Sequence, residues 1–312
     1  MPMSRRMMKG LLAGGMAMAV FASPLALFLD TDAPPDPPAS PAGPTGTPRP
    51  SASGPRLDPF AQRDGPFALT RRDVERASWS WSRAKTLAAG IHEDQLPARN
   101  RVSSFYCGCQ IERRGRSGGD VVFSSCDFET SDNPTRARRL EWEHVVPAAF
   151  IGRGRSCWTD GHESCIDDGV PFKGRKCCMM SDPGFIMAAS DPVNLVPSVG
   201  EINGDRSNYL FGLINGEKRD YGQCDFEVDT RNRIAEPAPS KRGDIGRIWA
   251  YMSRAYGLAL PRDKANLYTR WIKQDPVSQE EIVINEAISR SGHRANPFVL
   301  TPRTNSENRE EP

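Results

Sequence analysis

The sequence predicts an α+β fold, a mixed domain of helices and short strands held together by disulfide bonds. Segments with the spacing of amphipathic helices occur near both ends of the expected folded region, and shorter alternating segments lie between them. All eight cysteines lie in that same region. An even number of cysteines in an exported chain is typical of a disulfide framework.

The first expected elements are a helix and a hairpin. Residues 69–90 have helical spacing, with Thr70 as the N-cap and Gly90 as the stop. Residues 103–112 and 120–128 resemble strands, and the turn-forming run RRGRSGG joins them. We therefore expect one N-terminal helix followed by a two-stranded hairpin.

A short strand and two further helices complete the expected domain. The alternation in LEWEHVV, residues 140–146, predicts a strand that runs into a loop at Pro147. Residues 242–257 and 262–273 are amphipathic and have the spacing of helices. Gly257 is suited to end the first of them, since glycine adopts the left-handed conformation of helix ends.

The two ends of the chain have a different composition. Residues 1–30 combine Arg5, Arg6 and Lys9 with an uncharged apolar run, which indicates a signal peptide or, if it is not cleaved, a signal anchor. Residues 31–65 are rich in proline and small residues and predict a disordered linker. We expect the folded domain over residues 66–300 and a disordered tail over 301–312.

The cysteines favour a periplasmic or secreted location. A structural zinc site is the alternative, but the cysteines lack the paired spacing of a zinc ribbon. A bridge between Cys109 and Cys126 could join the predicted hairpin, while the sequence leaves the connectivity open. The disulfide candidates are Cys107, Cys109, Cys126, Cys157, Cys165, Cys177, Cys178 and Cys224.

The net charge of the chain excludes few classes of protein. A net charge of +2 argues against a polybasic tail protein and is compatible with a nucleic-acid binder, because a basic groove can coexist with acidic patches.

Glu143 and His144 are the first candidates for chemistry. A carboxylate beside a histidine offers a ligand for a hard metal ion and a neutral base. Adjacent residues on a strand face opposite sides, so the two side chains diverge unless the strand ends there, as Pro147 suggests. Taken alone, the pair is also compatible with a packed histidine in a strand.

A second polar segment follows at residues 190–208. It contains Asp191, Asn194, Glu201 and Asn203 in close order. These residue types are common in turns and loop caps, so the segment alone does not establish a site.

Seven segments of the chain are informative when they are taken together. They are SSFYCGC (103–109), LEWEHVVPA (140–148), CWTDGHESC (157–165), DPVNLVPSVGEINGDRSN (191–208), YGQC (221–224), AEPAPSKRGDIGRIWAYM (235–252) and GHRANPFV (292–299). In this order, over about two-thirds of the chain, they resemble the bacterial endonuclease I family, whose members are periplasmic or secreted.

The resemblance implies a ββα-metal (His-Me finger) core that holds one divalent cation. It implies His144 as the general base, and Glu143 and the amide oxygen of Asn203 as the metal ligands. The cation would be Mg²⁺ or another divalent ion such as Mn²⁺ or Ca²⁺. Asn194 is interpreted as a residue that shapes the loop.

The implied activity is a metal-dependent, sequence-nonspecific endonuclease that hydrolyses phosphodiester bonds of DNA and, as a second substrate, RNA. Lack of specificity would follow from contacts to phosphates, for which Arg155 and Arg206 are candidates. We expect a monomer without a protein partner. Membrane contact is expected only if residues 1–30 remain attached.

Two departures from the family bear on activity. Relatives carry an arginine in the loop that follows the CW cysteine, whereas residues 157–165 contain His162 and Glu163 there. Either Arg155 or Arg175 substitutes, or the chain is a catalytically weakened, nucleic-acid-binding relative. The family's C-terminal cysteine pair is absent and Cys177-Cys178 is gained, which predicts rearranged bridges.

Overall fold

The computed structural model describes residues 60, 67–93, 102–216 and 218–299. These residues belong to the larger of two compact units, which covers residues 55–312. The expected signal segment, the linker apart from Phe60, and the expected tail lie outside the described residues.

The N-terminal helix is interrupted. Thr70 caps α1 (Arg71–Glu75) as predicted, but the chain continues as the 3-10 helix η1 (Arg76–Ser78) and then as α2 (Trp81–Glu93). The expectation of one continuous helix was wrong, because Trp79 is extended and packs into the core. The stop at Gly90 was also wrong, since Ile91 and His92 are buried and extend α2.

The predicted hairpin is present with shorter strands. It consists of β2 (Gln110–Arg114) and β3 (Gly118–Val122), with β1 (Val102–Ser103) paired antiparallel to β2. Residues 123–125 form the 3-10 helix η2 instead of extending β3. The bridge between Cys109 and Cys126 joins the two ends of this hairpin.

A second pair of strands leads directly into a helix. β4 (Leu140–His144) pairs antiparallel with β7 (Leu195–Val199), and α8 (Gly200–Arg206) begins at the next residue. β4 ends before Pro147, as predicted, and α4 (Ala148–Gly152) begins immediately after that proline.

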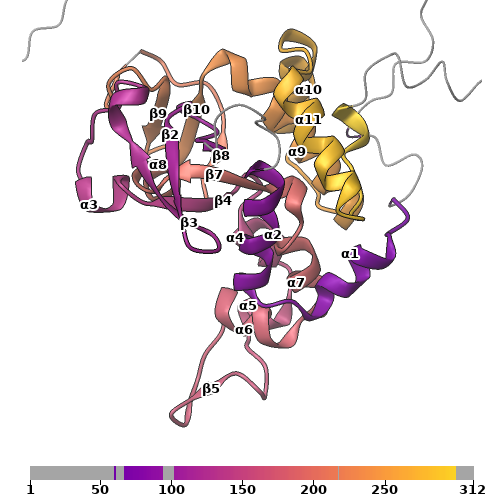
Figure 1. The fold of residues 1–312 in the computed structure, drawn as a ribbon. Coiled ribbons are helices and arrows are strands. Elements are labelled where there is room, and N and C mark those ends of the chain that lie inside the picture. The colour runs from indigo at the N-terminus through magenta and orange to yellow at the C-terminus, as the bar shows by residue number, and fades with distance from the viewer. Residues whose placement is uncertain (1–59, 61–66, 94–101, 217, 300–312) are drawn as a thin grey trace, which may run out of the picture. The chain divides into compact units, whose positions relative to one another are not determined.

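Short helices fill the chain around these strands. They are α3 (Pro134–Ala137), α5 (Ser156–Thr159), α6 (Arg175–Ser181), α7 (Pro183–Ala189) and the 3-10 helix η3 (Pro192–Asn194). Between α5 and α6, the hairpin of β5 (Ile166–Asp167) and β6 (Val170–Pro171) projects outward (Figure 1).

The C-terminal part combines a small sheet with three helices. β8 (Leu210–Phe211), β10 (Ile234–Pro237) and β9 (Phe226–Asp229) form a sheet in that order. The helices are α9 (Pro239–Tyr256), α10 (Arg262–Gln274) and α11 (Gln279–Arg290), followed by the 3-10 helix η4 (Pro297–Val299).

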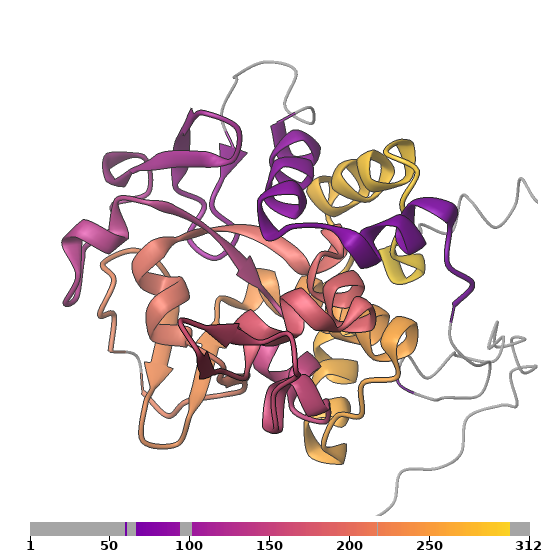
Figure 2. The same ribbon diagram turned by 90° about the horizontal axis from the view of Figure 1, so that it is seen from below.

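The two predicted C-terminal helices are therefore confirmed. Gly257 ends α9 in the left-handed conformation, with φ of 65°. The sequence analysis missed α11, whose start is marked by a capping box between Ser278 and Glu281. Figure 2 shows α11 (yellow) beside the N-terminal α2, which it contacts.

The core is continuous across these elements. Its largest fully buried aromatic side chains come from α7, β8, β9 and the C-terminal helices, and include Phe185, Phe211, Phe226, Trp249 and Tyr268. Within the described part of the chain, no helix is both long and apolar enough to cross a bilayer.

The cysteines form four disulfides, which confirms the disulfide framework over the zinc alternative. The pairs are Cys107–Cys224, Cys109–Cys126, Cys157–Cys178 and Cys165–Cys177. Cys157–Cys178 joins α5 to α6, and Cys165–Cys177 joins the start of the projecting hairpin to α6.

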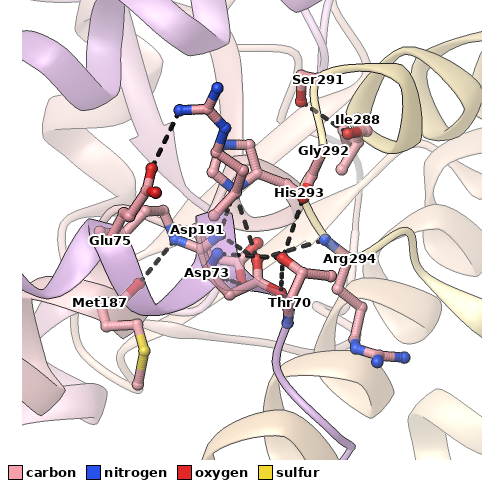
Figure 3. A network of polar contacts seen from close by, with 12 residues as sticks. Thr70, Asp73, Glu75, Met187, Asp191, Ile288, Ser291, Gly292, His293 and Arg294 are labelled. Carbon is pink, nitrogen blue, oxygen red and sulfur yellow. Dashed lines mark hydrogen bonds and ion pairs between the residues drawn. The ribbon is translucent and has the colours of Figure 1, made fainter.

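A buried polar network joins the N-terminal helices to distant parts of the chain (Figure 3). Arg76 is fully buried and pairs with Asp73 and, at 3.0 Å, with Asp191. Its Nε also donates to the carbonyl oxygen of Met187, at 3.4 Å, near the end of α7. Burial opposes the charge of Asp73, but a hydrogen bond with His293 and the charge of Arg76 lower the pKa of this carboxyl.

Candidate active site

One polar cavity lies where β4 ends beside α8. It has a volume of about 370 Å³. Its lining brings together Glu143, His144 and Asn203, the three residues expected to act together. The other lining residues are Arg136, Trp142, Pro147, Ala148, Ala149, Trp158, Arg175, Gly204, Ser207 and Asn208.

The imidazole of His144 is held from two sides. Its Nε2 lies 2.7 Å from the carbonyl oxygen of Ala189, and its ring stacks on Trp81 with 4.9 Å between the centroids. A carbonyl oxygen can only accept, so Nε2 carries the hydrogen and Nδ1 is the acceptor in the neutral ring. Burial, followed by the charge of Arg175, lowers the pKa of His144 to about 3. The ring is therefore neutral at physiological pH.

Glu143 is buried on the side of the strand that faces α8. Its Oε1 accepts a hydrogen bond from Arg206 Nη1 at 2.5 Å and a longer one from the hydroxyl of Tyr106. Burial raises the pKa of Glu143, and the nearby Arg206 opposes this rise. Both of these hydrogen bonds go to Oε1, so Oε2 is the oxygen left for a cation.

Asn203 lies in the middle of α8. Its Nδ2 donates to Glu141 Oε2 at 2.8 Å. This hydrogen bond identifies the nitrogen of the amide, so Oδ1 points away from Glu141. Gly204, the next residue, lets Arg136 approach α8 closely, because a Cβ there would lie 2.1 Å from Arg136 Nη1.

The sequence analysis did not identify Glu141. It accepts hydrogen bonds from Arg136 and Arg139 as well as from Asn203. The signal was available, since residues two apart on a strand share a face and Glu141 precedes Glu143 by two. Its position makes it the orienting partner of the Asn203 amide.

Asn194 has the loop-shaping position that was expected. Its amide accepts from the backbone N–H of Val146 at 2.7 Å and donates to the carbonyl oxygen of the same residue at 3.0 Å. It therefore fixes the chain that follows His144.

The two arginines expected at phosphates lie elsewhere. Arg206 is fully buried, and besides Glu143 it binds the backbone carbonyls of His144 and Val145. Arg155 pairs with Asp182 at 2.7 Å and is absent from the lining of the cavity. Because their donors face protein acceptors, this geometry argues against both as phosphate ligands.

Arg175, one of the two arginines expected to substitute for the family's loop arginine, lines the cavity. It is exposed to solvent and lies with Cζ 4.9 Å from the centre of the Trp81 ring. Cys157 pairs with Cys178 rather than with Cys165. The loop that Cys157 closes thus extends to residue 178 and contains Arg175, so it does not lack an arginine.

The donor set fits a hard cation with few protein ligands. A carboxylate oxygen of Glu143 and an amide oxygen of Asn203 line the same cavity, and Mg²⁺ prefers oxygen ligands and retains several waters. No group of three or more His, Cys, Asp or Glu side chains among the described residues is arranged to hold a metal ion. A site with several carboxylates is therefore not found in that part of the chain.

These features define a disulfide-bonded α+β protein whose cavity joins a neutral histidine, two oxygen ligands and an arginine that has no ion pair among the described residues. Comparison with known proteins identifies the family. The model of the family described as Endonuclease I matches residues 81–303. The chain belongs to the endonuclease I family.

Individual relatives agree with this assignment. Endonuclease-1 of Buchnera aphidicola subsp. Acyrthosiphon pisum is 38% identical over 69% of this chain and 78% of its own length. An extracellular deoxyribonuclease of Aeromonas hydrophila is 38% identical over 63% of this chain and 80% of its own. A periplasmic deoxyribonuclease of the same organism is 37% identical over 64% and 79%, respectively.

Proposed function

We propose that this protein is a metal-dependent, sequence-nonspecific endonuclease that hydrolyses phosphodiester bonds of DNA and also of RNA. The observation that carries the proposal is that neutral His144 shares one cavity with Glu143, Asn203 and Arg175. Relatives named deoxyribonuclease support DNA as the substrate.

His144 acts as the general base. Because Nε2 donates to Ala189, Nδ1 is the atom that takes a proton from the attacking water. The oxygen of that water bonds to phosphorus as the bond from phosphorus to the leaving sugar oxygen breaks. A positioned base of this kind contributes about 10²–10⁴-fold to the rate.

Glu143 Oε2 and Asn203 Oδ1 would hold one divalent cation, such as Mg²⁺, Mn²⁺ or Ca²⁺. When bound, the cation supplies charge neutralisation at the phosphate and leaving oxygens. In this assignment β4, β7 and α8 form the ββα-metal core. Arg206 and Glu141 orient the two ligands through their hydrogen bonds.

Arg175 binds the phosphate during cleavage. Its guanidinium makes no hydrogen bond or ion pair with the residues that the structure describes, unlike those of Arg136, Arg155 and Arg206. A planar guanidinium can bind two phosphate oxygens at once. It therefore supplies the positive charge expected of the family's loop arginine.

We further infer export to the periplasm or the medium through the N-terminal signal. The four disulfides fit an oxidising compartment, and relatives named extracellular and periplasmic support this location.

The proposal is tested with the purified protein and supercoiled plasmid in Mg²⁺, with and without EDTA, beside His144→Ala. We expect nicking and degradation that disappear with the chelator and fall by about 10²-fold or more in the variant. Binding of DNA without cleavage by the wild-type protein would instead favour the catalytically weakened relative. Wild-type activity in His144→Ala would refute the assignment of the base.

A further inference from the structure

A second polar cavity adjoins the first. It has a volume of about 430 Å³, and it shares Arg136, Trp142, Arg175 and Asn203 with the cavity of His144. The residues that only the second cavity contains include Trp81 and Lys85 from α2. The two cavities therefore adjoin, and Arg175 lines both of them.

Two cations gather around one tryptophan in this second cavity. Lys85 Nζ lies 6.0 Å, and Arg175 Cζ 4.9 Å, from the centre of the Trp81 ring. Such positions over an aromatic ring are favourable for cations. The ring of His144 also stacks on Trp81, so the cations lie next to the proposed base.

Lys85 and Arg175 make no ion pair with any carboxylate in the described part of the chain. The acid that lines this cavity is Glu141, and it is already bound by Arg136 and Arg139. Lys85 is half-buried and Arg175 is exposed. Because neither forms an ion pair with a described carboxylate, their positive charge favours an anion here.

We propose that this second cavity is a subsite for the phosphate next to the scissile one on the same nucleic-acid strand. Lys85 binds that neighbouring phosphate, while Arg175, between the two cavities, contacts the scissile phosphate. The inference rests on the proposed function, since it takes the ligand of the first cavity to be a phosphodiester. It makes the preferred substrate a chain with at least two phosphates.

The test compares dinucleotides that differ by one phosphate. Thymidylyl-(3′→5′)-thymidine contains a single phosphodiester, and the same molecule with an added terminal phosphate, at the 5′ or at the 3′ end, offers the second anion. The measured quantity is the ratio of kcat/KM with the added phosphate to kcat/KM without it. The proteins compared are the wild type, Lys85→Gln, Lys85→Arg and Arg83→Gln.

The matched control is Arg83, which lies on the same helix two residues away. It packs over Trp79, 4.4 Å from the ring centre, and lines neither cavity. We expect the added phosphate at one end to raise kcat/KM of the wild type by about three- to tenfold. The ratio should fall toward one in Lys85→Gln, recover in Lys85→Arg, and stay at the wild-type value in Arg83→Gln.

A second readout does not depend on cleavage. In EDTA, the affinity for a short single-stranded oligonucleotide is measured against salt concentration. The slope of log Kobs against log salt concentration is negative. Its magnitude should decrease by about 0.7 in Lys85→Gln, because one phosphate contact is lost, and should keep the wild-type value in Arg83→Gln. A wild-type ratio and slope in Lys85→Gln would overturn the subsite. Failure of the wild type to cleave plasmid would overturn the proposed function instead.

Discussion

The guanidinium of Arg206 binds the Glu143 carboxylate at 2.5 Å inside the protein, where both side chains are almost completely inaccessible to solvent. The same guanidinium also holds the backbone carbonyls of His144 and Val145. One buried arginine thus fixes the proposed metal ligand and the end of the strand that carries the proposed base.

Removing this arginine should damage both stability and metal binding. In Arg206→Met, Glu143 keeps its burial but loses its counter-charge, so the pKa of its carboxyl rises and the charged form becomes less favourable. Breaking a buried pair from one side costs about 3–5 kcal/mol. Urea unfolding should show this loss, and calorimetric titration with Mg²⁺ should show weaker binding.

The control for that variant is Arg155→Met. This arginine pairs with Asp182 in a partly exposed position, so its removal should cost no more than about 1 kcal/mol and leave the Mg²⁺ affinity unchanged. Equal losses in the two variants would contradict the positioning role of Arg206.

Arg175→Ala should lower kcat strongly while the protein remains folded. Loss of one donor to a developing charge costs about 10²–10³-fold in kcat. The guanidinium has no protein acceptor among the described residues, so the unfolding free energy should change little. Plasmid cleavage rates and urea unfolding measure the two effects.

The neighbouring Lys176→Ala is the matched control. Lys176 pairs with Asp167 on the exposed hairpin and lies outside the cavity, so this variant should cleave like the wild type. If Arg175→Ala also did so, Arg175 would not be the phosphate ligand.

Local sequence signals predicted several elements of this fold. Pro147 marked the end of β4, and Thr70 and Gly257 marked the ends of helices. Their effects depend on neighbouring residues only, which is why they can be read along the chain. The family resemblance predicted that Glu143, His144 and Asn203 act together, and all three line one cavity.

Other features depend on partners far away in the sequence. Arg206 was predicted to contact phosphates, but its hydrogen bonds to β4 place it in the interior. Arg175 entered the site because Cys157 pairs with Cys178, and spacing alone left that pairing open. The helix break after Ser78 likewise accompanies a buried ion pair between Arg76 and Asp191, which lie more than a hundred residues apart.

The bridge between Cys165 and Cys177 should stabilise the segment that carries Arg175. It closes the hairpin next to α6, with a sequence separation of 12. Replacing both cysteines by serine removes this bridge and keeps Cys157–Cys178 intact. We expect a loss of about 2–4 kcal/mol in the unfolding free energy and lower cleavage activity.

Calorimetry and plasmid cleavage, under oxidising conditions, measure both consequences. The double variant at Cys109 and Cys126 is the comparison, because it removes a bridge far from Arg175 along the chain. Loss of activity in the Cys165 and Cys177 double variant, but not in the Cys109 and Cys126 double variant, would support the role of the bridge. Full activity without Cys165–Cys177 would contradict it.

The buried His92 should make the protein less stable in acid. Burial lowers the pKa of His92 to about 4, against an ordinary value near 6.5, although its hydrogen bond with the carbonyl oxygen of Leu195 opposes this shift. The unfolded chain therefore binds a proton below about pH 6.5 that the folded chain binds only below about pH 4. Stability falls as the pH drops through this window, by up to about 3 kcal/mol from this residue.

His92→Gln removes the titrating group and keeps a donor for Leu195. In urea unfolding from pH 7 to pH 4, with EDTA present, the variant should lose less stability than the wild type. The exposed His162, replaced in the same way, is the matched control variant. An identical acid slope in wild type and His92→Gln would show that His92 is not the group whose protonation opposes folding, because a glutamine has no proton to bind in this range.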